Sequence, residues 1–342
     1  MATYDAIVVG GGPAGSTCAY RLASAGASVL LLDRARFPRD KACGGAVTAR
    51  ALRELPVGIE HVVENVVSLF ELRVRHRRGF SRVAPLPLAY MTQRRRLDSY
   101  LVERAVEAGA ELRVGTAAAE IRQDGVDGDH ARVVIGADGA NGISRRAFDT
   151  PRRTAVALEG NLPRKPGRYA DRLVLEFGTV LGGYGWIFPK GDHLNVGVGG
   201  WESEAPHLRA HLARLCEAHG FDRASLTDVR GHHLPFRRRG STLAAGRIAL
   251  IGDAAGLADP LSGDGMYEAA LSARLAAEHT LAILRGEQDC FTGYARDIAS
   301  HLAPLMRISW PAKHAFDRFP TLSFTVARTP QFWNLVTRML QG

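Results

Sequence analysis

The stretch Asp5-Ala-Ile-Val-Val-Gly-Gly-Gly-Pro-Ala-Gly15 decides the fold of this chain. Four apolar residues run directly into glycines at Gly10, Gly12 and Gly15, and the alanine-rich segment 16–25 follows. This order is typical of a parallel strand that turns into a helix. The first glycine allows the tight turn, the second lets the backbone approach a pyrophosphate, and the third lets the helix pack close to the strand. The free N–H groups and the positive end of the helix dipole favour an anion there.

A second apolar run, Ser28-Val-Leu-Leu-Leu-Asp33, ends in an acidic residue 18 positions after Gly15. A carboxylate there can accept hydrogen bonds from a ribose hydroxyl and disfavours a 2′-phosphate. A glycine-rich turn without a ligand would explain the glycines alone, but not the strand, helix and terminal acid that accompany them. Together these features predict a dinucleotide site.

The length and composition of the chain indicate a globular protein with a substantial core. Its 342 residues are 46% hydrophobic and 23% charged, which excludes a disordered or fibrous chain. The cysteines Cys18, Cys43, Cys216 and Cys290 lie far apart without zinc-like spacing, so we expect a reduced, cytoplasmic protein and no metal site. The N-terminus leads directly into the first strand, so we expect no signal peptide. No apolar run approaches the roughly 20 residues that span a bilayer.

The net charge of +9 comes from 44 basic and 35 acidic residues, with arginines clustered at 75–78, 94–96 and 237–239. The chain has no helix-turn-helix, zinc-finger or RNA-binding aromatic signature, so we expect no nucleic-acid partner. Solvated arginine faces, anionic lipid head groups or a phosphorylated substrate remain as explanations of the charge.

Periodicity and breaker residues predict the further elements. We expect strands over 68–75 and 80–84, joined by a turn at Gly79, and then over 111–115, 118–121, 131–136, 172–177, 184–189, 193–199 and 246–251. We expect helices over 47–55, 97–109, 206–220 and 265–284, and two or three more beyond 284, separated by Pro304, Pro311, Pro320 and Pro330.

This order predicts an α/β (α+β) fold in one body with two lobes. A Rossmann-like FAD-binding domain over 1–50, 93–150 and 236–285 is interleaved with an antiparallel-sheet substrate domain over 51–92 and 151–235. A C-terminal helical segment covers 286–342. No internal repeat and no proline- or serine-rich linker separates independent domains.

The choice of FAD over NAD rests on the second half of the chain. No second G-x-G-x-x-G occurs, but Gly252-Asp253 ends an apolar strand, and Pro260-Leu-Ser-Gly-Asp-Gly-Met266 opens a helix. A carboxylate at Asp253 suits the ribityl hydroxyls of FAD, which NAD lacks. The N–H groups of the helix start could face the O2/N1 edge of an isoalloxazine ring. A turn followed by a helix cap is the alternative explanation.

Three motifs resemble those of the flavin-monooxygenase-like superfamily, which includes aromatic hydroxylases and many FAD reductases. They are the 10–33 fingerprint, Ile135-Gly-Ala-Asp-Gly139 with Ser144 and Arg145, and Leu250-Ile-Gly-Asp-Ala254. Within that superfamily, two further motifs resemble the geranylgeranyl reductase family. These are Phe37-Pro-Arg-Asp-Lys-Ala-Cys-Gly-Gly45 and Tyr184-Gly-Trp-Ile-Phe-Pro189, which matches the family's Y-x-W-x-F-P motif. The connection between Ile121 and Val133 is shorter than in the family, and the chain ends early for an archaeal-type member.

The resemblance implies a set of site residues. It places Cys43, Gly44 and Gly45 beside the flavin, Arg94 near the cofactor, Ala118 at the adenine, and Gly263 and Gly265 at the isoalloxazine. With the motif residues, the predicted cofactor-binding set is Gly10, Gly12, Pro13, Ala14, Gly15, Asp33, Arg34, Cys43, Gly44, Gly45, Arg94, Ala118, Asp138, Asp253, Gly263, Gly265 and Met266. The predicted catalytic set is Cys43, Tyr184 and Trp186, and no metal ligand is predicted.

Tyr184 and Trp186 would line a channel in which a polyprenyl chain lies, where large flat side chains shield hydride transfer from water. The alternative is that both are ordinary core aromatics. Cys43 is either a reactive thiol or proton source, or a small buried residue.

The resemblance therefore implies an FAD-dependent reductase that saturates C=C bonds of a polyprenyl (geranylgeranyl-type) chain, with NADPH or a ferredoxin as electron donor. Cys43, Tyr184 and an ordered water are the candidate proton sources. A prenyl-lipid substrate would bring a monomer or homodimer to the membrane surface as a peripheral protein. The alternatives are an FAD-dependent aromatic monooxygenase using NAD(P)H and O2, and a prenyl-binding carrier without enzymatic activity.

Overall fold

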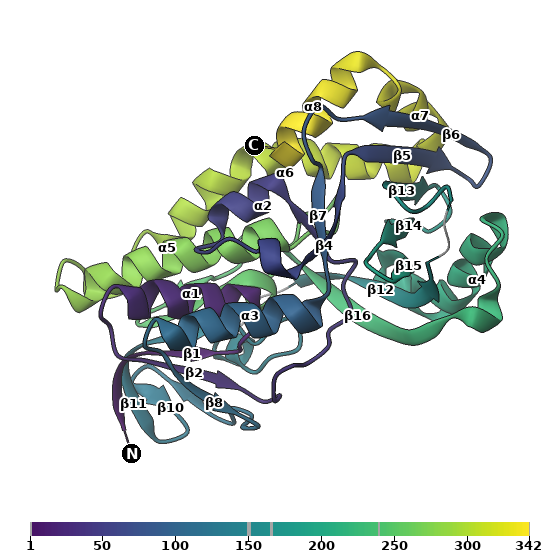
Figure 1. Ribbon diagram of the computed structural model, residues 1–342. Coiled ribbons are helices and arrows are strands. Elements are labelled where there is room, and N and C mark those ends of the chain that lie inside the picture. The colour runs from purple at the N-terminus through teal and green to yellow at the C-terminus, as the bar shows by residue number, and fades with distance from the viewer. Residues whose placement is uncertain (1, 149–151, 165–166, 239, 342) are drawn as a thin grey trace.

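A computed structural model describes residues 2–148, 152–164, 167–238 and 240–341. Arg239, the last residue of the predicted basic cluster 237–239, lies outside the described residues. Two sheets lie at opposite ends of the molecule, with long helices over the first and the C-terminal helices over the second (Figure 1).

The first sheet has eight strands and holds the N-terminal motif. Five of them run parallel in the order β18-β11-β1-β2-β8, and the hairpin strands β17, β9 and β10 are antiparallel to their neighbours. The strands are β1 (Thr3–Val9), β2 (Val29–Asp33), β8 (Glu111–Val114), β9 (Ile121–Arg122), β10 (Gly125–Val126), β11 (Asp129–Gly136), β17 (Ala244–Ala245) and β18 (Ile248–Leu250).

Three helices pack on this sheet: α1 (Pro13–Ser24), α3 (Arg94–Glu107) and α5 (Met266–Leu284). They lie side by side along one face in Figure 1, with α1 between the other two. The largest apolar core of the molecule fills this layer. β2 and β18 are buried at every position, as are the apolar second halves of β1 and β11, which is typical of parallel strands covered on both faces. The Rossmann-like expectation is therefore confirmed.

The predicted strand over 118–121 is wrong except at Ile121. The Asp127 carboxylate accepts hydrogen bonds from the N–H groups of Ala119 and Glu120, with its Oδ1 3.0 Å and 2.7 Å from the two nitrogens. These donors are therefore not available to a strand ladder.

The inserted sheet has seven strands in the order β16-β12-β15-β14-β13-β5-β6. They are β5 (Leu69–Val74), β6 (Arg78–Val83), β12 (Arg152–Pro163), β13 (Arg172–Phe177), β14 (Tyr184–Pro189), β15 (His193–Trp201) and β16 (Thr227–Arg237). The expectation of an antiparallel sheet is wrong at one pair, because β13 runs parallel to β5. These two strands come from separate excursions of the chain, and the long connection between them permits a parallel pair.

Sequence patterns missed β12 and β16, the two longest strands of the inserted sheet. β16 is an edge strand whose side chains are mostly exposed, so it lacks the apolar alternation of a half-buried strand. The strand pairs with β12 from Arg152 to Asn161, with one register shift.

The β5–β6 hairpin turns at residues 75–77, and the predicted turn residue Gly79 lies within β6. Arg75 and His76 both take left-handed backbone conformations, with φ of 50° and 56°. The N–H of His76 donates to Oε1 of Glu176 on β13 at 2.7 Å, and this tertiary contact holds a turn that the local sequence does not favour.

Smaller elements connect the two lobes. The strands β3 (Ala46–Thr48), β7 (Ala89–Thr92) and β4 (Val63–Val67) form a third sheet, next to α2 (Ala49–Glu54). Helix α4 (Leu208–Ala218) covers one face of the inserted sheet.

The C-terminal region contains α6 (Tyr294–Arg318), α7 (Pro320–Ala327) and α8 (Pro330–Gln341). The prediction that Pro304 and Pro311 end helices is wrong, because α6 continues through both. Its buried stripe includes Ile298, Leu302 and Leu305, and this packing outweighs the hydrogen bonds that the prolines remove. Within the described residues, no helix combines the length and apolarity needed to cross a membrane.

Candidate active site

A cavity of about 670 Å³ lies between the first sheet and the inserted sheet. Every predicted site residue except Gly15 lines it: Gly10, Gly12, Pro13, Ala14, Asp33, Arg34, Cys43, Gly44, Gly45, Arg94, Ala118, Asp138, Tyr184, Trp186, Asp253, Gly263, Gly265 and Met266. The structure thus brings together residues that lie up to 256 positions apart in the chain (from Gly10 to Met266).

The parallel sheet explains why these residues meet. Val9 of β1 pairs with Gly136 of β11, which in turn pairs with Leu250 of β18. The carboxyl ends of parallel strands share one edge of the sheet, so the loops that follow them converge. Asp138 and Asp253 come directly after two of these strands, and both line the cavity.

The glycine turn is sterically constrained at two positions and open at the third. A Cβ on Gly15 would lie 1.8 Å from the carbonyl oxygen of Gly10, so α1 can approach β1 only with glycine there. Gly10 has a φ of 110°, and a Cβ on it would lie 2.4 Å from the carbonyl oxygen of Ala137. A Cβ on Gly12 would come no closer than 3.5 Å to any other atom, so Gly12 leaves the cavity side of the turn open.

Two guanidinium groups reach this open position. The Cβ of a residue at Gly12 would lie 3.5 Å from Nη2 of Arg39 and 3.8 Å from Nη2 of Arg94. Asp98 holds both arginines, through two hydrogen bonds of 2.7 and 2.8 Å from Arg94 and an ion pair of 3.1 Å with Arg39. Burial works against the charge of Arg94, but Asp98 raises the pKa of its guanidinium above the ordinary value. The turn thus offers two fixed cations beside a helix N-terminus, as a diphosphate requires.

The two motif carboxylates have defined partners. Asp33 accepts hydrogen bonds from the N–H of Gly11 at 2.7 Å and of Ala35 at 2.8 Å, which orients the carboxylate at the end of β2. Asp253 pairs with Nζ of Lys41 at 3.0 Å and lies 3.5 Å from Nε2 of His232. Against the effect of burial, these two groups hold the pKa of Asp253 well below its usual range. Asp253 is therefore an ionised hydrogen-bond acceptor.

The loop 34–45 crosses the cavity and is fastened to the inserted sheet. Asp40 pairs with Arg230 of β16 at 2.8 Å, and the N–H of Cys43 donates to Oε1 of Glu159 on β12 at 2.6 Å. A Cβ on Gly44 would lie 2.9 Å from the ring of Phe188, so the loop packs directly on β14.

Lys190 packs against the Gly45 end of the same loop. Its Nζ donates to the carbonyl oxygen of Thr92 at 2.6 Å, and it would lie 1.8 Å from a Cβ on Gly45. The residue is 2% exposed, and burial lowers the pKa of its ammonium to about 8, although Cys43 and Glu159 act in the opposite direction.

One wall of the cavity is aromatic. Tyr184, Trp186 and Phe188 alternate along β14 and share one face, with neighbouring ring centroids 6.2 and 6.4 Å apart. The indole of Trp186 lies against Gly197, where a Cβ would come within 2.1 Å of it. Its Nε1 donates to Oδ1 of Asn195 at 2.8 Å, which fixes the ring plane.

Burial shifts the pKa of several carboxyl groups near the cavity upward. Burial raises the pKa of Glu159, against the hydrogen bond from the N–H of Cys43. Burial also raises the pKa of Asp264, and burial together with Asp264 and Asp259 raises the pKa of Glu268 well above its usual value. Both carboxyl oxygens of Glu268 lack a hydrogen-bond partner among the described residues.

The hydroxyl group of Tyr184 is already engaged. It donates to the carbonyl oxygen of Ser262, and burial raises its pKa above the usual value. A proton shared with a carbonyl on the loop 260–265 is poorly placed for delivery to a substrate.

Sequence reasoning missed Glu159, Lys190, His232 and Arg39 as site residues. Glu159 and His232 lie on the two strands that the sequence pattern did not reveal. Arg39 lies inside the quoted 37–45 motif, and Lys190 directly follows the 184–189 motif. Arg39 and Lys190 could have been found from the sequence, because each is a charged residue inside or next to a specific motif.

These features fit FAD. The open glycine turn with Arg39 and Arg94 suits a pyrophosphate, and Asp33 and Asp253 supply acceptors for sugar hydroxyls at separate places in one cavity. The volume lies within the usual range for cofactor and ligand sites, which is roughly 300–1,000 Å³.

Comparison with known proteins agrees with this site. Residues 3–161 match the family described as FAD binding domain, so FAD is the cofactor. The geranylgeranyl diphosphate reductase of Rhodobacter capsulatus is 33% identical over 307 residues, which cover 82% of this chain and 76% of that protein. Digeranylgeranylglycerophospholipid reductase 1 of Methanopyrus kandleri is 33% identical over 300 residues, which cover 80% of each chain.

Solved structures share the fold. A geranylgeranyl bacteriochlorophyll reductase-like protein of Thermoplasma acidophilum superposes with a TM-score of 0.84 at 23% identity, covering 98% of this chain and 92% of the other. A probable FAD-dependent monooxygenase of Pseudomonas aeruginosa superposes with a TM-score of 0.74 at 20% identity, covering 92% and 97%. The fold alone therefore does not distinguish a reductase from a monooxygenase.

Proposed function

The chain belongs to the geranylgeranyl reductase family of FAD-dependent oxidoreductases, and from this premise we propose that it saturates C=C bonds of a polyprenyl chain. The observation that carries the substrate class is the apolar part of the cavity. Beyond the aromatic wall, its lining consists of Phe70, Leu88, Leu173, Leu175 and Leu340. Such a lining suits an isoprenoid.

The chain supplies binding and positioning around the cofactor. When bound and reduced, FAD supplies a hydride. Arg39, Arg94 and the first turn of α1 hold the diphosphate, and Asp33 and Asp253 accept hydrogen bonds from sugar hydroxyls. We propose that Cys43, Gly263 and Gly265 lie beside the flavin and that Trp186 lines the substrate channel. The aromatic face of β14 orients the alkene and excludes water.

Saturation of an alkene also consumes a proton. Glu159 is our candidate donor, because its carboxyl group lines the cavity and burial favours its protonated form. Its Oε1 accepts the N–H of Cys43, so its position is fixed relative to the loop 34–45. In the reaction, the O–H bond of Glu159 breaks and a C–H bond forms on one alkene carbon, while the hydride forms the other C–H bond.

The two lobes have separate binding roles in this proposal. In our proposal 1–50, 93–150 and 236–285 bind FAD, 51–92 and 151–235 form the substrate-binding domain, and the C-terminal helices close the apolar end. The electron donor is NADPH or a ferredoxin. Anaerobic mixing of the oxidised protein with each donor, followed by flavin absorbance, distinguishes them.

We further propose that the protein is peripheral at the membrane, docked through α7 and the neighbouring loop after β6. Phe319, Leu322 and Val326 share one face at helical spacing and are 55%, 64% and 50% exposed. Val83 and Leu86 are 70% and 60% exposed. β6 and the loop after it lie next to α7 and α8. Arg82 donates a hydrogen bond to the carbonyl oxygen of Arg328, and Gln341 donates one to the carbonyl oxygen of Leu86.

Charge and position support this docking face. Arg318, Arg328 and Arg338 are exposed at the ends of α6, α7 and α8, where they can meet anionic head groups. Leu340 of α8 lines the apolar end of the cavity, so a lipid could pass from the membrane to the site over a short path.

Vesicle flotation tests the docking face. Vesicles of phosphatidylglycerol and phosphatidylcholine should bind the protein, whereas pure phosphatidylcholine should bind it less. The double variant Leu322→Glu/Val326→Glu should bind the phosphatidylglycerol vesicles at least about tenfold more weakly, because each change would place a charge in the apolar layer of the membrane. Val229→Glu is the matched control, since Val229 is 39% exposed on β16, at the edge of the inserted sheet opposite to β6. Equal loss in the control, or none in the double variant, refutes the docking face.

The substrate assignment has its own test. The photo- or dithionite-reduced protein is incubated anaerobically with geranylgeranyl diphosphate, an unsaturated diether phospholipid and menaquinone, and products are analysed by mass spectrometry. We expect the gain of one H2 per reduced bond with at least one of these substrates. If all three stay unsaturated, and a phenol instead stimulates NADPH oxidation in air, the monooxygenase alternative holds.

A further inference from the structure

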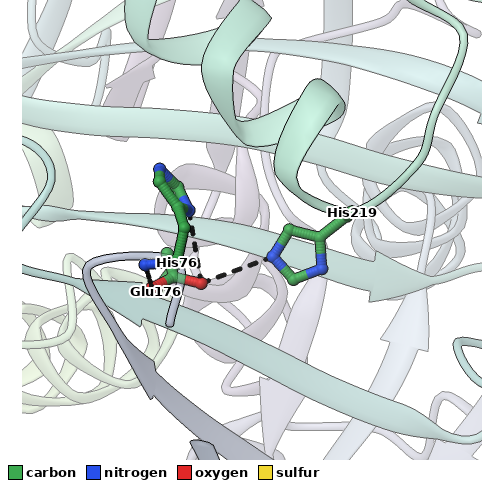
Figure 2. A group of neighbouring side chains, drawn as sticks. All are labelled: His76, Glu176 and His219. Carbon is green, nitrogen blue, oxygen red and sulfur yellow. Dashed lines mark hydrogen bonds and ion pairs between the residues drawn. The ribbon is translucent and has the colours of Figure 1, made fainter. Parts of the chain in front are cut away.

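Outside the FAD cavity, three side chains from three separate elements converge on one point (Figure 2). Glu176 lies on β13, His76 in the β5–β6 turn, and His219 directly after α4. Oε2 of Glu176 lies 3.4 Å from Nδ1 of His76 and 3.4 Å from Nε2 of His219. All three ligand atoms lie within 4.8 Å of one another.

We propose that His76 Nδ1, Glu176 Oε2 and His219 Nε2 bind a divalent transition-metal ion such as Zn²⁺. Zinc binds imidazole nitrogen and carboxylate oxygen at about 2.0–2.2 Å, almost always in tetrahedral geometry. Ligand atoms of such a site are separated by about 3.4 Å, as this bond length and the tetrahedral angle require. Both His–Glu separations match that value, and a water molecule can take the fourth position.

The orientation of the two rings supports the site. Nδ1 of His219 pairs with the hydroxyl group of Tyr169 at 2.8 Å, which leaves Nε2 as the nitrogen that faces Glu176. Metal-binding histidines commonly have their second nitrogen held in this way. Nδ1 of His76 is buried and has no hydrogen-bond partner among the described residues. A metal ion would satisfy it.

Arg73 would compete with a metal ion for Oε2 of Glu176. Its Nε lies 3.3 Å from Oε2 of Glu176, while its Nη1 donates to Oε1 of Glu71 at 3.0 Å. A bound cation would take over the Glu176 contact, and Arg73 would keep Glu71 as its partner. The N–H of His76 would still donate to Oε1 of Glu176 and orient the carboxylate, as outer-shell donors commonly do.

The site is structural and separate from the proposed reaction. Leu173 and Leu175 of β13 line the cavity, whereas Glu176 lies on the opposite face of the strand, on the side of α4. None of His76, Glu176 and His219 lines the cavity. A metal would fasten the strained turn at Arg75 and His76 to β13 and to the end of α4. This inference does not rest on the proposed function, and its failure leaves that function untouched.

Zinc titration of the full chain tests the site. The FAD-loaded protein is stripped with chelator, dialysed, and titrated with Zn²⁺ by calorimetry and with Co²⁺ by visible absorbance. We expect one ion per chain, the intense d–d bands of tetrahedral Co²⁺, and a higher melting temperature with Zn²⁺. His219→Gln and His76→Gln should each weaken binding by about 100-fold or more, because each removes one of three ligands.

His211→Gln is the matched control. His211 on α4 pairs with Glu204 at 2.9 Å but belongs to no group of three possible metal ligands among the described residues, so its loss should not change the stoichiometry or affinity. Far-UV circular dichroism and flavin absorbance in chelator show whether each variant has folded. Arg73→Gln should tighten binding, because a competing cation is removed. The inference is overturned if wild-type protein binds no zinc, or if folded His219→Gln binds zinc as tightly as wild type.

Discussion

Burial of Lys190 should make the stability of this protein depend on pH in a defined direction. Its ammonium is surrounded by the loop 34–45 and the third sheet, and burial lowers its pKa from 10.5 to about 8. The unfolded chain therefore binds more protons than the folded one between about pH 8 and 10.5. The free energy of unfolding must consequently rise as pH rises through this window.

The magnitude follows from the same values. The drop of about 2.5 pH units at about 1.4 kcal/mol per unit means that the charged ammonium destabilises the fold by about 3 kcal/mol at pH 7. By pH 10, most of this should have disappeared, because the folded state is by then neutral at Lys190. Lys190→Met removes this dependence, and it also removes the hydrogen bond to Thr92, a loss that does not vary with pH.

The assay is guanidinium unfolding of wild type and Lys190→Met at pH 7, 8.5 and 10, followed by tryptophan fluorescence. Other groups that titrate at alkaline pH are shared by both proteins, so they cancel in the difference. We expect wild type to gain about 2 kcal/mol relative to the variant between pH 7 and pH 10. A difference that stays constant within about 0.5 kcal/mol would refute the reasoning, because the buried ammonium would then have an ordinary pKa.

Three further predictions concern the cavity. Gly15→Ala should give a protein that purifies without flavin absorbance, because its Cβ would lie 1.8 Å from the carbonyl oxygen of Gly10, whereas Gly231→Ala, whose Cβ meets only one atom at 3.5 Å, should stay yellow. Glu159→Gln should keep its flavin and the Cys43 hydrogen bond but reduce substrate about 100-fold more slowly or worse, since the amide cannot act as the acid; an unchanged rate would exclude Glu159 as the donor. Tyr184→Phe should slow reduction less than about tenfold, because its proton is engaged with a carbonyl, and a larger loss would restore Tyr184 as a candidate acid.

The sequence by itself determined the βα unit and the sheet around it. The constraint at Gly15 is local, since a Cβ there collides with the carbonyl oxygen of Gly10, whereas a Cβ on Gly10 would collide with Ala137, which follows β11. The apolar runs that became β1, β2, β11 and β18 are buried on both faces, so their composition alone identifies them. The glycine–carboxylate pattern at Asp33 and Asp253 followed directly from these strands.

The tertiary structure alone decided what surrounds Cys43. Glu159 reaches its N–H from β12, a strand that the sequence pattern did not reveal. Lys190 reaches Gly45 only because β14 and β15 turn beside the third sheet. Such contacts depend on how two sheets are placed relative to each other.

The same holds for the three residues that we propose as metal ligands. His76 and Glu176 lie 100 positions apart, and Glu176 and His219 lie 43 apart. They meet because β13 pairs in parallel with β5, the pair that departs from the antiparallel arrangement expected from the sequence. Local periodicity records which face of a strand is buried, but long-range pairing decides which polar side chains share that face, because pairing energy is spread over many weak contacts and leaves no signature at any single residue.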